Sequence, residues 1–318
     1  MNYYFAPLEG ITGYIFRNTF EEYFGGIDKW FTAFLSPNQQ GGLRTREIED
    51  VLPEHNTGIA LVPQILSNHA PSFLMTANRL YEQGYEEINL NLGCPSGTVT
   101  AKGKGAGFLG RPQELERFLE TIFQGFPGKI SIKTRLGVRD TEEFPHLLEL
   151  YNQYPVSELI IHARVQKDFY KNTPHWDMIA YAEQHANMPI CYNGDLFTPQ
   201  DLRSFHERFP SLDTVMLGRG LLADPCLLLR MEGKEQPYIQ KIADFHTALL
   251  DRYQKVMPGD RALLFRMKEH WVYLGCLFAD CGKQLKRIRK AQSCADYRKA
   301  ADDLFSQCEV LPASVFHG

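Results

Sequence analysis

The chain has 318 residues, of which 44% are hydrophobic and 23% are charged, and its net charge of −4 argues against a generic binder of polyanions. No apolar run approaches the roughly 20 residues of a membrane span, and the N-terminus lacks the basic and apolar segments of a signal peptide. Because seven cysteines, an odd number, fit reduced thiols better than a disulfide framework, we expect a cytoplasmic protein with no membrane contact.

Short apolar runs alternate with helical stretches along the first two thirds of the chain, which predicts an α/β fold. The predicted strands are residues 3–5, 30–35, 59–65, 87–92, 129–134, 159–163, 189–193 and 214–217. About eight such strands over roughly 220 residues favour a (β/α)8 TIM barrel, with a doubly wound sheet as the alternative. Among the intervening helices, one ends near Gly84, and another opens at Pro112 with Leu115, Phe118 and Ile122 on its apolar face.

The strand pattern stops after Lys234, and residues 239–305 have the spacing of amphipathic helices. We therefore predict a barrel domain over residues 1–237, a linker near Gln236 and Pro237, and a helical domain over residues 238–318. From Tyr238 onward the chain holds 13 Lys and Arg against 9 Asp and Glu. A basic segment on an acidic body indicates either a localised nucleic-acid contact or simply a solvated helix face.

Polar residues fall at or just beyond the ends of the predicted strands. They are Glu9, Gln64, Asn91, Lys133, His162, Asn193 and Arg219. In a barrel of parallel strands these ends converge on one mouth, where active sites are built. The sequence therefore predicts one site at the carboxyl ends of the strands.

The most specific motif is Asn-Leu-Gly-Cys-Pro-Ser, from Asn91 to Ser96. It resembles the N-x-G-C-P-S signature of the dihydrouridine synthase family. Further strings follow in the family's order: Ala6 to Gly10, Gln64, Lys133 to Gly137, His162 to Arg164, Asn193 to Asp195, and Gly218 to Gly220. The resemblance covers nearly the whole chain. It implies an FMN-dependent barrel enzyme that reduces uridine to 5,6-dihydrouridine in tRNA with NADPH or NADH. The sequence leaves the oligomeric state open, with a monomer favoured.

Cys94 on its own would more often be a small buried residue than a reactive one. A free thiol has a pKa of about 8.5, so it is mostly protonated at neutral pH and can donate a proton. The resemblance implies that hydride passes from flavin N5 to C6 of uracil and that Cys94 protonates C5.

Glycine-containing turns follow the last two predicted strands, where barrel enzymes commonly bind phosphate. These turns hold Asn193, Gly194, Asp195, Gly218 and Arg219, and we expect them to bind the FMN phosphate. Lys133 suits a Schiff-base nucleophile, an ion-pair partner or a donor to reduced flavin. The resemblance implies the last role, and it places the remaining flavin contacts at His162, Gln64, Pro7, Leu8 and Glu9.

The resemblance assigns the target uracil and its surroundings to Asn91, Arg135 and Arg164. Lys102 suits RNA phosphate in a glycine-rich stretch after Cys94. The basic run that contains Lys286, Arg287 and Lys290 is expected to hold tRNA phosphates.

Two further patterns are expected to carry no cofactor. Residues 105–110 match G-x-G-x-x-G but lack the preceding strand that a dinucleotide fingerprint requires. The spacing of Cys276, Cys281 and Cys294 fits packing better than an iron–sulfur site, and we expect no metal.

The sequence departs from the family's usual strings at Leu8, Ser67, Ala163 and Val165. The substrate is therefore left open, and ribosomal RNA is a second candidate target. Three other functions are compatible with these residues. They are a small-molecule FMN oxidoreductase of the dihydropyrimidine or dihydroorotate type, a lyase that uses Lys133, and an RNA-binding protein without catalysis.

Overall fold

The structure is a computed structural model that describes residues 1–233, 238–314 and 316. The predicted linker at Gln236 and Pro237 lies outside the described residues. The chain divides into two compact units. The barrel unit comprises Met1–Pro7, Asp28–Gly194 and Arg208–Met216, and the helical unit comprises Leu8–Ile27, Asp195–Glu207 and Leu217–Gly318.

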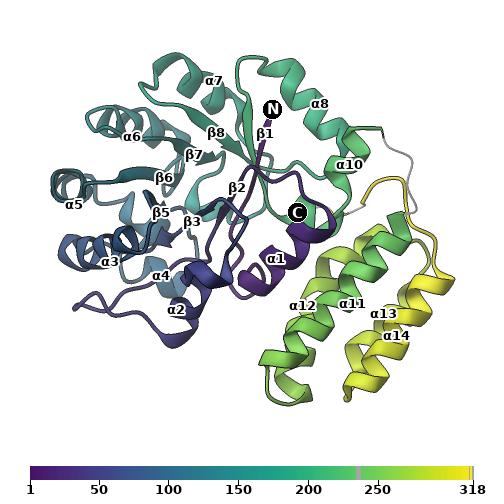
Figure 1. Cartoon of the computed structure of the whole chain (residues 1–318). Coiled ribbons are helices and arrows are strands. Elements are labelled where there is room, and N and C mark those ends of the chain that lie inside the picture. The colour runs from purple at the N-terminus through teal and green to yellow at the C-terminus, as the bar shows by residue number, and fades with distance from the viewer. Residues whose placement is uncertain (234–237, 315, 317–318) are drawn as a thin grey trace. The chain divides into compact units, whose positions relative to one another are not determined.

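One parallel sheet forms the barrel unit (Figure 1). Its strands are β1 (Asn2–Phe5), β2 (Lys29–Phe31), β3 (Leu61–Val62), β4 (Gln64–Ile65), β5 (Glu87–Leu92), β6 (Lys129–Arg135), β7 (Leu159–His162), β8 (Ile190–Asn193) and β9 (Thr214–Leu217). The order is β3-β2-β1-β9-β8-β7-β6-β5-β4. Its two ends, β3 and β4, are separated in the chain only by Pro63.

Pro63 explains why one predicted strand appears as two short ones. Proline has no N–H to donate to a neighbouring strand, so it interrupts the ladder. When β3 and β4 are counted as one strand, the sheet has eight strands and closes on itself. The predicted TIM barrel is confirmed, and the doubly wound sheet is wrong because the first and last strands of the order meet at Pro63.

Helices follow the strands and cover the outside of the sheet (Figure 1). In the barrel unit they are α2 (Thr45–Val51), α3 (Ala70–Glu82), α4 (Gly97–Thr100), α5 (Pro112–Gly125), α6 (Phe144–Tyr151) and α7 (Trp176–His185). The helix predicted to open at Pro112 is confirmed as α5, which buries Leu115, Phe118 and Ile122 on one face.

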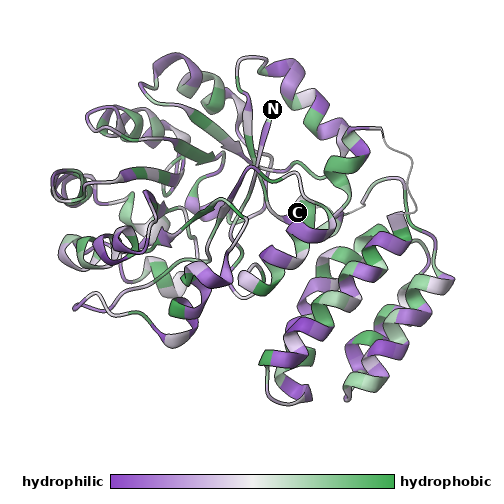
Figure 2. Cartoon of the chain, in the orientation of Figure 1, coloured by the Kyte–Doolittle hydropathy of each residue, from purple (hydrophilic) through white to green (hydrophobic). Residues whose placement is uncertain are grey.

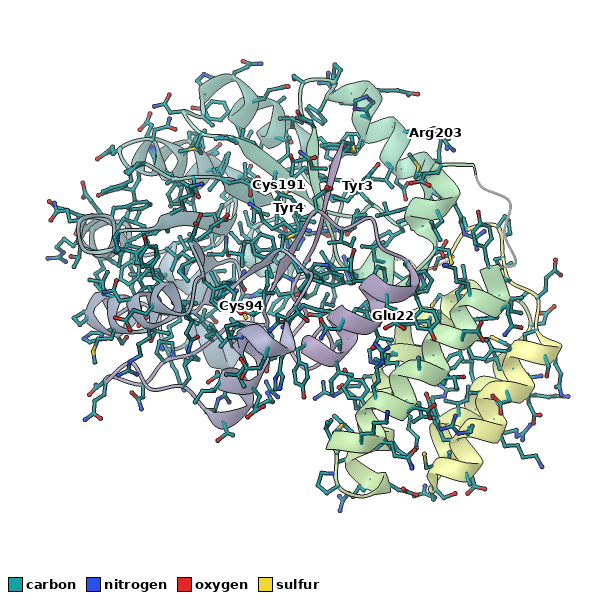
Figure 3. All side chains as sticks on the ribbon, viewed as in Figure 1. Tyr3, Tyr4, Glu22, Cys94, Cys191 and Arg203 are labelled. Atoms are coloured by element: carbon teal, nitrogen blue, oxygen red, sulfur yellow. The ribbon has the colours of Figure 1, made fainter. Side chains whose placement is uncertain are left out.

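The barrel interior is apolar in its middle and charged at the amino ends of the strands. Tyr4 and Cys191, seen inside the sheet in Figure 3, belong to a cluster of buried side chains. The Lys29 ammonium lies 3.0 Å from the Glu87 carboxylate and 3.2 Å from that of Glu158, which also accepts a hydrogen bond from Tyr4. These contacts compensate charges that would be costly to leave unpaired there.

The helical unit contains the remaining helices. They are α1 (Tyr14–Tyr23), α8 (Pro199–Arg208), α9 (Arg219–Ala223), α10 (Leu227–Met231), α11 (Tyr238–Val256), α12 (Asp260–Leu274), α13 (Gly282–Lys290) and α14 (Cys294–Gln307). Helices α11 to α14 show mixed hydrophilic and hydrophobic faces in Figure 2, as their sequence predicts. Phe16 of α1 packs edge-on against Phe245 of α11, so an early segment completes the core of the C-terminal helices.

A buried hydrogen-bond network fixes the packing of the C-terminal helices. The Tyr297 hydroxyl lies 2.7 Å from His246 Nε2 and accepts a hydrogen bond of 2.7 Å from Trp271 Nε1. Burial lowers the pKa of His246 to about 3, so its ring is neutral at physiological pH. In the described residues, no helix is both long and apolar enough to cross a membrane.

Candidate active site

Strand register brings several of the predicted site residues to neighbouring positions near the carboxyl ends of the strands. Asn91 of β5 is paired with Lys133 of β6. Arg135 of β6 is paired with His162 of β7, which is paired in turn with Asn193 of β8. Because neighbouring parallel strands end together, these side chains share the carboxyl end of the sheet, as predicted.

Cys94 lies in a turn that Asn91 holds from within. The Asn91 side-chain oxygen accepts hydrogen bonds of 3.0 Å from the backbone N–H groups of Gly93 and Cys94. The thiol-bearing residue is half-buried just beyond β5. A short polar side chain that binds its own backbone in this way fixes a turn after the strand.

A chain of side-chain amides inside the barrel holds Asn91 in place. Asn91 Nδ2 donates to Gln64 Oε1 at 2.6 Å, and Gln64 Nε2 donates to Asn89 Oδ1 at 2.8 Å. Asn89 Nδ2 then donates to the Ser131 hydroxyl at 2.9 Å. Gln64 is predicted to contact flavin, which stays a prediction; in the structure its side-chain amide bonds to Asn91 and Asn89.

The glycine-rich stretch after Cys94 packs against the same turn. Ala106 N–H donates to the Cys94 carbonyl at 3.0 Å. Gly105 has φ +56°, and a Cβ atom there would lie 2.7 Å from the Cys94 carbonyl oxygen, so only glycine fits. Gly105 begins a 3₁₀ turn (Gly105–Phe108) and not a helix that follows a strand. In this described stretch of the chain, no strand directly precedes these glycines, as the sequence indicates.

Lys133 has no acidic partner among the described residues. Its ammonium donates to Asn193 Oδ1 at 2.7 Å, and Asn193 Nδ2 donates to the Met216 carbonyl at 2.8 Å. Burial, together with the nearby Arg135 charge, lowers the pKa of Lys133 to about 7. An uncompensated cation of this kind at the barrel mouth fits an anionic or strongly accepting group of a ligand.

Arg135 connects two loops at the mouth. Its Nε donates to the Gly93 carbonyl at 2.9 Å, and Nη1 donates to the Val165 carbonyl at 3.0 Å. The guanidinium carbon also lies 5.5 Å from the centre of the Tyr170 ring. Arg135 therefore links the Cys94 turn to the loop after β7.

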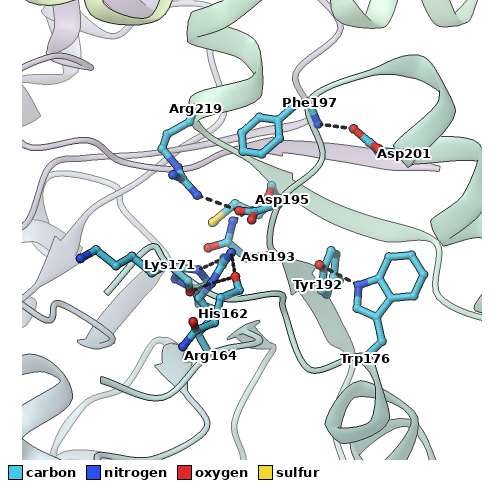
Figure 4. Close-up of polar contacts among 12 residues, drawn as sticks. His162, Arg164, Lys171, Trp176, Tyr192, Asn193, Asp195, Phe197, Asp201 and Arg219 are labelled. Carbon is cyan, nitrogen blue, oxygen red and sulfur yellow. Dashed lines mark hydrogen bonds and ion pairs between the residues drawn. The ribbon is translucent and has the colours of Figure 1, made fainter. Parts of the chain in front are cut away.

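Arg164 holds the loop after β7 (Figure 4). It is 1% exposed and donates to the Lys171 carbonyl at 2.8 Å and the Asn172 carbonyl at 2.6 Å. Its Nη1 lies 3.3 Å from Nε2 of His162. Phe169 in this loop has φ +53°, a conformation that costs of order 1–3 kcal/mol and persists only where neighbours enforce it.

Sequence reasoning missed Tyr170, which this loop presents to solvent. Tyr170 is 48% exposed, and its ring centre lies 5.9 Å from that of His162. An exposed aromatic ring beside Arg135 is a surface on which a planar base can stack. The adjacent aromatic pair Phe169 and Tyr170 in an otherwise polar stretch was the available signal.

The predicted residues of the helical unit include the loops that follow β8 and β9. Asp195 and Arg219 form an ion pair of 2.7 Å, drawn in Figure 4. A Cβ atom on Gly220 would lie 2.2 Å from the Leu196 carbonyl oxygen, so these two loops touch through backbone. At the end of β1, Leu8 N–H donates to the Thr12 hydroxyl, and Glu9 is exposed.

The predicted RNA contacts are solvent-accessible lysines and arginines in both units. Lys102 is exposed beside the Cys94 turn, in a segment held by Asn68 Nδ2, which donates to its carbonyl. In α13, Lys286, Arg287 and Lys290 are solvent-accessible, and Arg287 pairs with Asp303 of α14 at 2.6 Å. Among the described residues, no group of three His, Cys, Asp or Glu side chains is arranged to hold a metal ion.

Comparison with known proteins gives a consistent match. The model of the family described as dihydrouridine synthase (Dus) matches residues 4–305. A tRNA-dihydrouridine(16) synthase of Aquipseudomonas alcaligenes is 28% identical over 91% of this chain and 95% of its own length. The enzyme of the same name from Ralstonia nicotianae is 30% identical over 72% of each chain. An old yellow enzyme homologue from Zymomonas mobilis has a similar fold, with a TM-score of 0.55 at 10% identity over 74% of this chain and 89% of that chain.

Proposed function

Because the chain belongs to the dihydrouridine synthase family, we propose that it reduces uridine to 5,6-dihydrouridine in tRNA, with bound FMN and NADPH or NADH as reductant. The observation that carries the proposal is the fixed Cys94 turn. It lies on the strand end next to Lys133, and Asn91 holds it through two backbone hydrogen bonds.

Enzymes of this family are flavoenzymes, and the donor set at the barrel mouth fits a flavin. Lys133 offers a positive charge that no carboxylate among the described residues neutralises, which suits the electron-rich pyrimidine edge of a reduced flavin. His162, Asn193, Gln64 and Pro7 are the further contacts that we assign to its ring. When bound, FMN would supply the hydride that goes to C6 of uracil.

We assign the FMN phosphate to the loops after β8 and β9, with Gly194, Asp195, Gly218 and Arg219. Backbone N–H groups of such glycine turns are good donors to phosphate. Leu8 and Glu9 would contact the flavin through their backbone. These assignments rest on strand ends and loop chemistry of the kind that barrel enzymes use for phosphate.

Cys94 would then donate the proton. Reduction of the C5=C6 bond needs a hydride at C6 and a proton at C5, and the thiol S–H bond supplies the second. Asn91 keeps Cys94 in place through a backbone hydrogen bond. Arg135, which binds the Gly93 carbonyl of the same turn, and the neighbouring Tyr170 ring would contact the uracil. The thiolate left behind is reprotonated from solvent, so the full cycle consumes one NADPH and one proton.

RNA would reach the site with its target base out of the helical stack, because a stacked uracil cannot approach a flavin. Lys102 and the α13 residues Lys286, Arg287 and Lys290 would bind backbone phosphates. Arg164, which is buried, would act by holding the loop that carries Tyr170. Two relatives are named for position 16 of tRNA, and we propose the same position here.

A lysine with a lowered pKa is also what a Schiff-base lyase uses, but a lyase carries no flavin, so flavin absorbance of the purified protein separates the lyase from the proposed enzyme. A second assay separates the proposed enzyme from a small-molecule oxidoreductase. Purified protein is incubated with NADPH and with tRNA from cells that lack dihydrouridine, and the nucleosides are analysed by mass spectrometry. We expect dihydrouridine at position 16. Reduction of free dihydropyrimidine precursors or orotate without tRNA would favour the small-molecule oxidoreductase, and modification of ribosomal RNA alone would change the substrate.

A further inference from the structure

The Arg219 guanidinium contacts two aromatic rings in addition to a carboxylate. Besides the ion pair with Asp195, its central carbon lies 5.4 Å from the centre of the Phe197 ring and 5.7 Å from that of Phe316. The two rings are themselves 5.3 Å apart. The side chain is 14% exposed. A planar guanidinium held in this way has little freedom to rotate.

Each ring is fixed by an element of its own. The Asp201 carboxylate accepts hydrogen bonds from the backbone N–H of Phe197 at 3.0 Å and of Thr198 at 2.8 Å, at the start of α8. Figure 4 shows the Phe197 ring between this turn and Arg219. Phe316 comes from the end of the chain, where its ring lies 5.5 Å from that of Tyr273 at the end of α12.

Residues 309–314, which precede Phe316 in the sequence, are also held by hydrogen bonds. Ala279 N–H donates to the Glu309 carbonyl at 2.9 Å, and Leu311 N–H donates to the Leu277 carbonyl at 2.9 Å. Ser314 is buried, and its hydroxyl accepts a hydrogen bond from Phe316 N–H. These contacts fix residues 309–314 against the turn that follows α12, within the helical unit.

We propose that Phe316 is a positioning residue for the cofactor phosphate. Together with Phe197 it orients the Arg219–Asp195 pair, which ties the loop after β8 to the loop after β9. The spacing of the phosphate-binding N–H groups on these loops therefore depends on Phe316. The assignment rests on the proposed FMN function and adds to it a residue more than 90 positions beyond the phosphate loops.

The test compares FMN with riboflavin, which has the same ring system and no phosphate. Each ligand is titrated into flavin-free protein, and binding is followed by flavin fluorescence. Phe316→Ala should weaken FMN binding about 2- to 30-fold, the range of one cation–π contact, and leave riboflavin binding unchanged. Phe316→Leu fills the space without an aromatic face and should show a similar loss, whereas Phe316→Tyr should bind FMN like the wild type.

Phe265→Ala is the matched control, because Phe265 on α12 is 68% exposed and should leave both ligands unaffected. Wild-type FMN affinity in Phe316→Ala and Phe316→Leu, or equal losses for FMN and riboflavin, would overturn the assignment while leaving the proposed function intact. Wild-type protein that binds neither flavin would remove the proposed function and this assignment together.

Discussion

Lys133 is the residue whose environment departs most clearly from that of a surface lysine. A lysine on a protein surface stays charged to about pH 10.4. Burial and the neighbouring Arg135 lower the pKa of Lys133 to about 7, and its bonded partner, Asn193, is neutral. In the flavin-free protein, the site therefore disfavours the charged form of Lys133. A bound reduced flavin would stabilise that charged form by accepting a hydrogen bond from the ammonium.

This environment predicts a pH dependence for the stability of the flavin-free protein. Between pH 7 and about 10.4 the unfolded chain binds a proton at Lys133 that the folded chain does not, so folding gains stability as pH rises. Lys133→Met has no titrating group at this position, so its free energy of unfolding lacks this pH dependence. The difference in the free energy of unfolding between Lys133→Met and the wild type, measured by urea unfolding, should therefore move in favour of the wild type from pH 7 to pH 9. A difference that stays constant over that range would mean that Lys133 titrates normally.

The position of Tyr170 predicts that its replacement weakens tRNA binding without changing the reaction of the enzyme with NADPH. Its exposed ring lies over Arg135 at the barrel mouth, and stacking of one base is worth about 1–3 kcal/mol. Tyr170→Ala should therefore raise the KM for tRNA roughly 5- to 150-fold and leave reduction of the enzyme by NADPH unchanged. Tyr81→Ala, an exposed tyrosine on α3, serves as control. An unchanged KM in Tyr170→Ala would remove the ring from the substrate site.

Helix α13 carries a basic run in which two lysines lack an acidic partner among the described residues. Arg287 pairs with Asp303, whereas Lys286 and Lys290 have no ion-pair partner among the described residues. Replacing both lysines with alanine should reduce the slope of log K for tRNA against log salt by about 1.4 to 1.8, since each phosphate contact contributes about 0.7 to 0.9.

The matched control for α13 removes the same charge elsewhere. Arg117 and Lys129 are exposed on α5 and at the amino end of β6, and their double alanine variant should keep the wild-type salt slope. Equal losses in both double variants would show that only net charge matters, and no loss in either would remove α13 from the RNA surface.

The strands and their polar ends were predictable from sequence because both are local patterns. Apolar runs and the residues that follow them predicted the eight-stranded barrel and the placement of Asn91, Lys133 and Asn193 near the strand ends. The break at Pro63 was visible in principle, since proline cannot complete a ladder. The amide chain from Ser131 through Asn89 to Gln64 was not, because it joins strands that are distant in the sequence and depends on their register.

Side-chain direction was the other property that sequence could not supply. Arg164 follows a strand end in a string that resembles a family motif. Its guanidinium nevertheless donates hydrogen bonds to backbone carbonyls of the loop after β7. Tyr170 stands outside every motif and is exposed beside Arg135. A motif places a residue on an element, whereas its neighbours decide whether it contacts substrate or supports a loop.

At the level of the whole molecule, the two compact units do not follow the chain in order. Segments Leu8–Ile27 and Asp195–Glu207 belong to the helical unit, although the sequence pattern groups them with the barrel strands. Contacts such as Phe16 with Phe245 create this grouping, and no local pattern reveals them. The predicted boundary at residue 237 remains a prediction.

The most direct measurement follows one turnover of the reduced enzyme. Wild type and Cys94→Ala are reduced with NADPH under anaerobic conditions and mixed with tRNA that lacks dihydrouridine, and flavin reoxidation is recorded. Both proteins should bind FMN and accept hydride equally. Reoxidation should be about 10²- to 10⁴-fold slower in Cys94→Ala, the loss expected for a positioned general acid. Equal reoxidation rates would contradict the role of Cys94, and no reoxidation of the wild type by any tRNA would contradict uridine reduction itself.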